Sequence, residues 1–157
     1  ARLKPRLARS GLSNVHPARI EHERDTKIKR LAGKADRVLV DAPCSGLGTL
    51  RRNPDLKWRQ SEASVAELAL KQAAILDSAA KMVRPGGRVV YATCSLFTAE
   101  NDAIIEAFLA SHPDFTLTPA SEVLAKHGIE MTGDTLRLLP HLHNTDGFFA
   151  AVLDKKA

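Results

Sequence analysis

The sequence predicts an α/β fold, in which a parallel sheet carries an antiparallel edge formed by the C-terminal part of the chain. Two compact apolar runs, at residues 37–40 and 88–94, are separated by one long helical segment, which is the pattern of a parallel βαβ unit. Two further apolar runs, at residues 136–139 and 148–153, flank the turn-rich stretch HNTDG, which indicates an antiparallel pair. The chain of 157 residues is long enough for one ordinary domain with a hydrophobic core.

The N-terminal part is expected to hold one helix and one weak strand. Residues 2–11 are predicted to form a basic helix that ends near Gly11 and keeps Pro5 in its first turn, where a proline is tolerated. Residues 15–20 are predicted to form a short strand, which Pro17 restricts to the edge of a sheet.

The first long strand, RVLV, ends at Asp41, and a loop rich in Gly, Pro and Asn follows over residues 41–60. Loops of this length inside compact domains are usually functional or disordered. The next helix is expected to start at Ser61 or Ser64, and Ser64 and Glu67 have the spacing of a capping box.

This long helix is predicted to end at the segment RPGG, residues 84–87, because Pro disfavours a continued helix and Gly accepts a left-handed turn. A second apolar strand follows over residues 88–94, and Thr98 is placed to cap a helix over residues 99–110. The order strand, helix, strand, helix therefore supports the parallel part of the sheet.

Composition and charge restrict the class of protein. Apolar residues make up 44% and charged residues 26% of the chain, which is typical of a globular protein. No run reaches the roughly 18 apolar residues of a membrane span, and the basic N-terminus lacks the apolar segment of a secretory signal. A cytoplasmic location is expected. The missing initiator Met indicates a fragment or a trimmed chain. The net charge of +5 suits a phosphate-rich partner.

The two cysteines, Cys44 and Cys94, lie just beyond the carboxyl ends of the two strands predicted to be parallel. Ligands of open α/β sheets bind at this edge, so the two thiols could meet in one crevice. Their spacing matches neither a zinc site nor a CxxC pair. Position alone leaves two interpretations open, a catalytic pair and two inert thiols in a reducing compartment.

Six short segments accompany these cysteines along the chain: DAPCSG at 41–46, NPDLKW at 53–58, PGG at 85–87, ATCS at 92–95, LLPH at 138–141 and TDGFF at 145–149. In these segments and in their order, the chain resembles the RNA cytosine-5 methyltransferase family. Its bacterial small-subunit ribosomal RNA branch, the Sun/Fmu type, is the most similar. The resemblance favours the catalytic pair over two inert thiols.

The resemblance implies a Rossmann-like fold of S-adenosylmethionine-dependent methyltransferases and a role in methylating ribosomal RNA. Residues 1–157 would then form the C-terminal part of one catalytic domain. The first strands and their Gly-rich donor loop are missing from the sequence, so this chain alone is expected to bind the donor poorly. An acidic contact to the donor is expected at Glu21, Glu23 or Asp25, among which the sequence does not decide.

In the chemistry that the resemblance implies, a thiolate adds to carbon 6 of cytosine, so that carbon 5 can accept a methyl group. The resemblance assigns the attack to Cys94 and the release of the product to Cys44. Pro43-Cys44 also looks like the Pro-Cys nucleophile of DNA cytosine-5 enzymes, so the reverse assignment stays open. Disulfide formation is a minor alternative. An attacking thiol needs a lowered pKa.

Other residues near the cysteines also have expected roles, of which that of Asp41 comes from the resemblance and the others from the residues themselves. Asp41 is expected beside the donor or the target base, although an Asx turn is an alternative. Pro43 shapes the loop beside the substrate. Arg51 and Arg52 are expected to contact RNA phosphates, with an exposed charged surface as the alternative. Trp58 could stack on a base or pack inside, and packing is favoured.

His141 and His143, with Asp146 nearby, could suggest a metal site. Their alternation could instead simply place both histidines on one side of a strand end. No other ligands cluster with them, so no metal is expected. Asp146-Gly147 is predicted to form a hairpin turn instead. Two other functions stay open: a transfer RNA cytosine-5 methyltransferase and a basic RNA-binding module with inert cysteines. The sequence indicates neither protein partners nor an oligomeric state.

Overall fold

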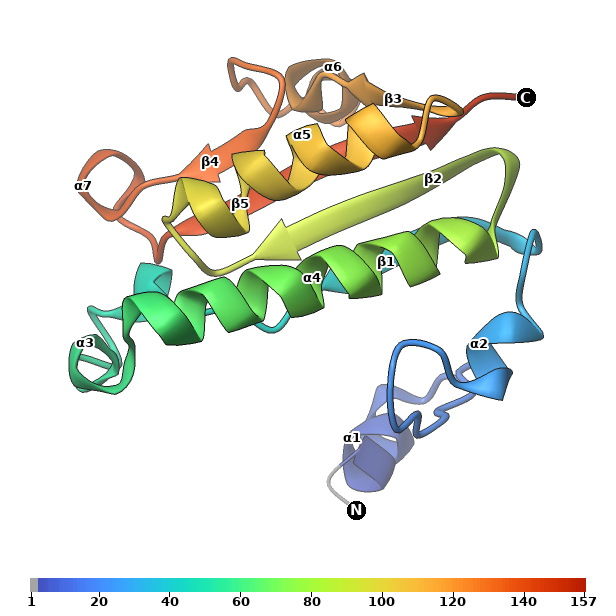
Figure 1. Cartoon of the computed structure of the whole chain (residues 1–157), viewed down its shortest axis with the longest axis horizontal. Coiled ribbons are helices and arrows are strands. Elements are labelled where there is room, and N and C mark those ends of the chain that lie inside the picture. The colour runs from blue at the N-terminus through green and yellow to red at the C-terminus, as the bar shows by residue number, and fades with distance from the viewer. Residues whose placement is uncertain (1–2) are drawn as a thin grey trace.

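A five-stranded mixed sheet forms the centre of the molecule in the computed structural model, which describes residues 3–157 (Figure 1). Its strands are β1 (Ala35–Asp41), β2 (Val83–Thr93), β3 (Phe115–Thr118), β4 (Leu136–Leu138) and β5 (Phe148–Lys155). β1 and β2 are parallel, whereas β5 is antiparallel to β2, β3 and β4. The predicted combination of a parallel part with antiparallel C-terminal strands is therefore confirmed. β5 lies inside the sheet, because it pairs with β2 along one side and with β3 and β4 along the other.

Helices of very different lengths connect these strands. The α-helices are α1 (Leu3–Ser10), α2 (Thr26–Lys29), α3 (Leu56–Arg59), α4 (Glu62–Met82), α5 (Asp102–Ser111), α6 (Ala120–Ala125) and α7 (Pro140–His143), and the 3-10 helices are η1 (Leu47–Thr49) and η2 (Thr98–Glu100). α4 joins β1 to β2, and Figure 1 shows α4 and α5 running across the same face of the sheet. None of the helices within residues 3–157 is long and apolar enough to cross a membrane.

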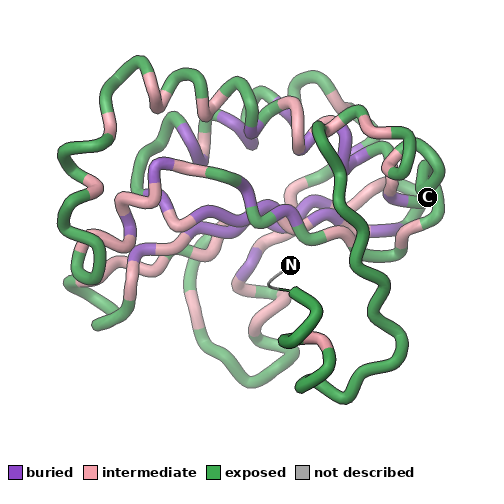
Figure 2. Tube along the Cα trace, turned by 90° about the horizontal axis from the view of Figure 1, so that it is seen from below, coloured by how far each residue is buried: buried purple, intermediate pink, exposed green. Residues whose placement is uncertain are grey.

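The hydrophobic core lies between this helical layer and the strands. Leu76 of α4, Tyr91 of β2, Phe108 of α5 and Leu153 of β5 are buried there. Figure 2 shows the buried residues concentrated along the strands, while the N-terminal segment is almost entirely exposed. The core thus supports β1 and β2, whose carboxyl ends carry the cysteines.

α4 begins and ends where the local sequence predicts. Ser61 is its N-cap: its side chain accepts a hydrogen bond from the Ser64 backbone N–H, and the Ser64 hydroxyl oxygen accepts one from the Ser61 backbone N–H. Ser64, rather than Glu67, therefore completes the capping box with Ser61, and the predicted pair Ser64 and Glu67 is wrong. The helix ends at Met82, as predicted. The predicted turn at 84–87, in which Gly86 has a φ of 71°, instead lies within β2, which begins at Val83 and pairs irregularly with β1 there.

The N-terminal predictions are partly correct. α1 and Gly11, with a φ of 67°, confirm the basic helix, whose predicted first residue lies outside the described part of the chain. Residues 15–20 do not form the predicted strand, because they are exposed and pair with none of the strands. A strand needs a partner for its backbone hydrogen bonds, and this segment has none in the sheet.

Three further segments differ from the predictions. The loop at residues 41–60 contains η1 and α3. α5 starts at Asp102, since η2 occupies residues 98–100 and Asn101, rather than Thr98, precedes the helix. β4 and β5 pair as predicted, but the helical turn α7 and the left-handed Asn144 connect them in place of a tight hairpin at Asp146-Gly147.

Candidate active site

The two cysteines meet at the carboxyl edge of the parallel strand pair. Cys44 lies three residues beyond β1 and Cys94 directly follows β2. Because these strands are parallel and in register, their ends reach the same edge of the sheet. The two sulfur atoms are 3.5 Å apart, and both residues are partly buried. The sequence-based expectation that the thiols converge is confirmed.

Glycine backbones hold together the two loops that carry Cys44 and Cys94, the cysteine loops. The backbone N–H of Gly48 donates to the carbonyl of Cys94 at 2.8 Å, and that of Gly147 donates to the carbonyl of Gly48 at 2.8 Å. A Cβ on Gly48 would lie 2.4 Å from the Gly147 oxygen and 2.6 Å from the Cys94 oxygen. The segment at residues 145–148, here called the TDGF segment, is therefore packed directly against both cysteine loops. Only glycine fits at position 48.

The environment of Cys44 favours the neutral thiol. Burial, followed by the neighbouring Cys94, raises the pKa of the Cys44 thiol from its ordinary value of 9.0 to about 12. Loss of water around a thiolate costs free energy, and a second sulfur nearby disfavours a second negative charge. The surroundings of Cys44 therefore favour its protonated form near neutral pH.

A buried polar network, which the sequence analysis missed, lies behind the cysteines. Glu100 is fully buried and accepts hydrogen bonds from the backbone and side chain of Ser45 and from the side chains of Ser95 and Gln72. Asn101, also buried, donates to the Ser95 carbonyl at 3.0 Å. Two signals in the sequence could have indicated this network. Glu100 and Asn101 are adjacent polar residues shortly after the strand that ends before Cys94, and Gln72 lies on the apolar side of the long helix.

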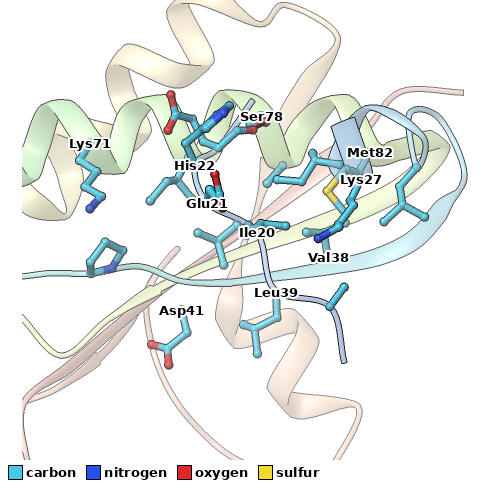
Figure 3. Close-up of a pocket in the computed structure, with 18 of the residues that line it drawn as sticks. Ile20, Glu21, His22, Lys27, Val38, Leu39, Asp41, Lys71, Ser78 and Met82 are labelled. Carbon is cyan, nitrogen blue, oxygen red and sulfur yellow. Dashed lines mark hydrogen bonds between the residues drawn. The ribbon is translucent and has the colours of Figure 1, made fainter. Parts of the chain in front are cut away.

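Asp41 lies at the edge of a pocket of about 570 Å³ beside β1. Asp41 and Pro43 line this pocket together with Glu21 and Glu23 of the N-terminal segment. Figure 3 shows Asp41 and Glu21 among the lining side chains. Asp41 and Leu39 are exposed, whereas the alternate residue Val40 is buried. Asp41 thus leaves β1 on the side opposite the core.

The three acidic candidates near residue 20 have different surroundings. The Asp25 side chain caps α2 and accepts a hydrogen bond from the Lys27 backbone, which is the main cause that lowers the Asp25 pKa. Glu23 is fixed through its backbone carbonyl, which accepts a hydrogen bond from Ser78 of α4. Glu21 and Glu23 line the pocket, whereas Asp25 is not among the lining residues.

Arg51 and Arg52 contact the TDGF segment. Arg52 Nε is 3.1 Å from Asp146 Oδ2, and Arg51 donates to the Thr145 carbonyl at 3.1 Å. The Arg52 side chain is nevertheless 72% exposed, so part of its guanidinium faces solvent. Both residues help to hold the segment, and neither position prevents contact with an external phosphate.

Trp58 does not pack inside, in contrast to the favoured prediction, because it is 80% exposed on the short helix α3. Lys57 Nζ lies 4.8 Å from the centre of the Trp58 ring, and Arg59 pairs with Asp55 on the surface. The four-residue helix α3 has no buried residues, so the indole ring of Trp58 has no hydrophobic core to pack against. An exposed aromatic ring among cations is a feature of surfaces that bind single-stranded nucleic acid.

A second, mostly apolar pocket of about 850 Å³ is lined in part by residues that follow the two cysteines. These are Leu47, three residues after Cys44, and Leu96 and Phe97, which follow Ser95. Pro43 lines the first pocket. Residues close to the cysteines in sequence thus line both pockets, although neither cysteine is itself among the lining residues.

His141 and His143 lie on the helical turn α7 rather than at a strand end. The backbone N–H of Leu139 donates to His143 Nδ1 at 2.9 Å, which gives this ring a structural role. Within residues 3–157, no three His, Cys, Asp or Glu side chains are arranged to hold a metal ion.

Comparison with known proteins identifies the family. Curated relatives include the probable ribosomal RNA small subunit methyltransferase B of Synechocystis, which is 50% identical over 122 residues, 76% of this chain and 27% of that protein. The protein of the same name from Bacillus subtilis is 38% identical over 162 residues, 98% of this chain and 35% of that protein. The chain thus spans about a third or less of the length of these relatives.

Solved structures agree with the fold. The crystal structure of PH0851 superimposes with a TM-score of 0.87 at 40% identity, over 98% of this chain and 34% of that one. NSun6 from Pyrococcus horikoshii with SFG gives a TM-score of 0.80 at 29% identity, over 99% of this chain and 38% of that one. The family described as 16S rRNA methyltransferase RsmB/F matches residues 2–154. The chain therefore belongs to the RsmB/F family of 16S rRNA methyltransferases.

Proposed function

We propose that this chain carries the reacting thiols of an S-adenosylmethionine-dependent RNA cytosine-5 methyltransferase. The observation that carries the proposal is the 3.5 Å separation of two thiols from different strand ends, in a chain of the RsmB/F family. Two thiols at one sheet edge suit a reaction in which one sulfur bonds the base and the other assists its release.

The Cys94 thiolate adds to carbon 6 of cytosine, which forms a sulfur–carbon bond and makes carbon 5 an enamine carbon. The donor would supply a methyl group bound to a positively charged sulfur: carbon 5 bonds the methyl carbon, the methyl–sulfur bond breaks, and the donor leaves as a neutral thioether that keeps the electron pair. Carbon 5 then loses its proton to a base, the sulfur–carbon bond breaks, and the double bond between carbons 5 and 6 is restored. The electrons of the broken bond return to the Cys94 sulfur.

The environment of Cys44 supports this assignment of roles. The raised pKa of Cys44 keeps its proton in place near neutral pH, so Cys44 is unsuited to attack. At 3.5 Å, its proton can be shared with the departing Cys94 sulfur during release. Both features support the choice of Cys94, which the family resemblance implies, as the attacking thiol, and the reverse assignment to the Pro-Cys position is its alternative.

The pocket beside β1 is the candidate donor site. Its lining combines apolar side chains, such as Ile20 and Ile75, with the carboxylates of Glu21 and Asp41. This combination fits an adenosine, whose base needs apolar surface and whose ribose hydroxyls need acceptors. SFG, present with NSun6 from Pyrococcus horikoshii, is an S-adenosylmethionine analogue, which supports the choice of donor. Asp41 would lie between the donor and the base.

Ribosomal RNA is the proposed substrate, as the names of the relatives indicate, and the reaction would then take place in the cytoplasm. The net charge of +5 favours association with a polyanion. Arg51 and Arg52 are proposed to contact phosphates beside the cysteine loops. Transfer RNA is the alternative substrate, since the same thiol chemistry serves both.

Residues 1–157 are proposed to be the C-terminal part of one catalytic domain, so the function is best tested in this chain and in a protein extended at its N-terminus. RNA containing 5-fluorocytidine distinguishes the candidates, because carbon 5 cannot lose fluorine as it loses a proton and the thioether persists. In the presence of S-adenosylmethionine, the longer protein should form an adduct that survives a denaturing gel. Its Cys94→Ala variant should form none.

A basic RNA-binding module with inert cysteines is the non-enzymatic alternative. Such a module would retain the RNA in a native gel and give no covalent adduct in the denaturing gel. RNA binding without adduct formation by the extended protein would therefore overturn the proposed mechanism. Bisulfite sequencing of the RNA product then identifies which cytosine is methylated.

A further inference from the structure

Glu100 is a completely buried carboxylate with four hydrogen-bond donors around it. Oε1 accepts from the Ser45 backbone N–H at 2.8 Å and from Gln72 Nε2 at 3.0 Å. Oε2 accepts from the Ser45 hydroxyl at 2.5 Å and from the Ser95 hydroxyl. No Lys, Arg or His is among these partners, so hydrogen bonds alone compensate the carboxylate for the loss of water.

These donors flank the two cysteines on both loops. Ser45 directly follows Cys44, and Ser95 directly follows Cys94. Gln72 also donates to the carbonyl of Pro43, the residue before Cys44, at 2.9 Å. One carboxylate thus joins two loops that lie 50 residues apart in the sequence and carry the reacting sulfurs.

Glu100 is itself firmly anchored. The buried hydroxyl of Tyr91 donates to the Glu100 carbonyl at 2.7 Å, which ties η2 to β2. The neighbouring Asn101 accepts from Thr93 at 2.6 Å and donates to the Ser95 carbonyl, and so fixes the residues on both sides of Cys94. A rigid acceptor at this position can transmit its placement to both loops.

We propose that Glu100 is a positioning residue that sets the separation of the Cys44 and Cys94 sulfurs by binding Ser45 and Ser95 simultaneously. Its purpose rests on the proposed function, in which both thiols act on one base. The separation of the sulfurs, however, can be measured in the 157-residue chain without RNA or donor. A failure of this inference is therefore distinguishable from a failure of the proposed function.

The test uses oxidised glutathione to close a disulfide between the two cysteines. One protein thiolate attacks the glutathione disulfide and releases one glutathione, and the second protein thiol then displaces the other glutathione. The protein dithiol loses two electrons and two protons, and two molecules of glutathione thiol are formed. The second step is intramolecular, so its rate reports how often the sulfurs are close enough to react.

Glu100→Ala should slow the intramolecular step by roughly tenfold or more, because the two loops lose their common acceptor. The attack of either single thiol on iodoacetamide should change much less, which a merely fold-stabilising role would not predict. Glu100→Gln should restore closure, since its amide oxygen can accept from Ser45 and the serine hydroxyls can turn to accept from its amide N–H. Glu106→Ala, an exposed Glu on α5, is the matched control and should behave like the unchanged chain.

Closure at the unchanged rate in a folded Glu100→Ala chain would overturn the inference, and so would a Gln variant as slow as the Ala variant. If Glu100→Ala does not fold, as judged by circular dichroism, the double variant Ser45→Ala and Ser95→Ala replaces it. This variant removes the two hydroxyl donors. It should slow closure by roughly threefold or more, because the two thiols are then less well oriented toward each other. Unchanged closure there would refute the role of Glu100.

Discussion

The sulfur of Cys44 lies 3.5 Å from the sulfur of Cys94, although 50 residues separate the two cysteines in the sequence. The parallel pairing of β1 and β2 brings the ends of their strands together, and Gly48 and the Glu100 network fix the remaining distance. The pair is therefore a product of the tertiary structure, and its chemistry can be tested one sulfur at a time.

In the N-terminally extended protein, changing each cysteine to alanine should impair a different step of the reaction. Cys94→Ala should abolish both methyl transfer and the covalent adduct, because no sulfur then bonds the base. Cys44→Ala should allow attack but slow release by roughly 10²- to 10⁴-fold, the range for a lost proton-transfer group. Denaturing gels of ordinary RNA would then show accumulated adducts only for Cys44→Ala. Adducts that accumulate in Cys94→Ala instead would reverse the two roles.

Alkylation should reveal the raised pKa of Cys44. Since only the thiolate reacts, the rate at Cys44 should rise about tenfold per pH unit from pH 7 to 10 without a plateau. In the urea-unfolded chain, both cysteines should approach a plateau above a pH of about 8.5. Iodoacetamide labelling followed by peptide mass spectrometry separates the two sites. A plateau at Cys44 below pH 9 in the folded chain would contradict the effect of burial.

The raised pKa of Cys44 also affects the free energy of unfolding. The pKa of Cys44 is higher in the folded chain than its ordinary value of 9.0, so folding favours the neutral thiol. This contribution to stability is complete below that ordinary value and is lost as the pH rises toward about 12.

How well the sequence predicts each part depends on how local its signals are. The strand at 37–40, the helix after Ser61 and the end of that helix before residue 84 follow from hydrophobic patterns, caps and the Pro-Gly-Gly segment within a few residues. β3 was not predicted, because Phe115–Thr118 is short and pairs with residues 152–155 of β5. The strand predicted at residues 15–20 shows the converse, a suitable local pattern without a partner.

The candidate active site also has parts that the sequence predicts and parts that it does not. The meeting of the thiols was predictable from topology, because both cysteines follow parallel strands. The role of Glu100 was not, because its partners Ser45 and Gln72 lie 55 and 28 residues away along the chain. Trp58 was misjudged because a large aromatic residue usually packs inside, whereas α3 lies at the surface.

Gly48→Ala should destabilise the chain and separate the cysteine loops. Its Cβ would meet backbone atoms of Gly147 and Cys94, which cannot rotate away as a side chain would. We expect a loss of about 3 kcal/mol in the free energy of unfolding, at the upper end for overpacking. Gly128→Ala is the control: its φ is 72° but no atom lies within 4 Å, so only backbone strain of about 1 kcal/mol is expected. Urea unfolding that gives equal losses would contradict the close approach.

Asp154→Asn should weaken the contact between β2 and β5. Arg88 donates to Asp154 through Nε at 2.6 Å and Nη2 at 2.7 Å, and this contact is the main cause that lowers the Asp154 pKa. At pH 7 the loss should be about 1–3 kcal/mol for a partly buried charged hydrogen bond.

Because the Asp154 pKa is lowered by folding, its contribution is present above the ordinary value of 3.8 and is lost as the pH falls through the lowered pKa. The difference between the two chains should therefore shrink in urea titrations between pH 5 and 2. Asp36→Asn, which removes an exposed pair with Arg84, should have a much smaller effect at pH 7. A difference independent of pH would exclude the ion pair as its cause.

Trp58→Ala should separate RNA binding from folding. Trp58 is 80% exposed, so its removal should change the free energy of unfolding by no more than about 0.5 kcal/mol. A base stacked on its ring would lose about 1–3 kcal/mol of binding free energy, which is roughly a 5- to 150-fold weaker affinity. Fluorescence anisotropy with an unpaired, cytosine-containing RNA measures this, and Leu70→Ala, 76% exposed on α4, is the control. Equal affinities for both variants would show that α3 takes no part in RNA binding, whereas a loss confined to Trp58→Ala would place the RNA across α3 beside the cysteine loops.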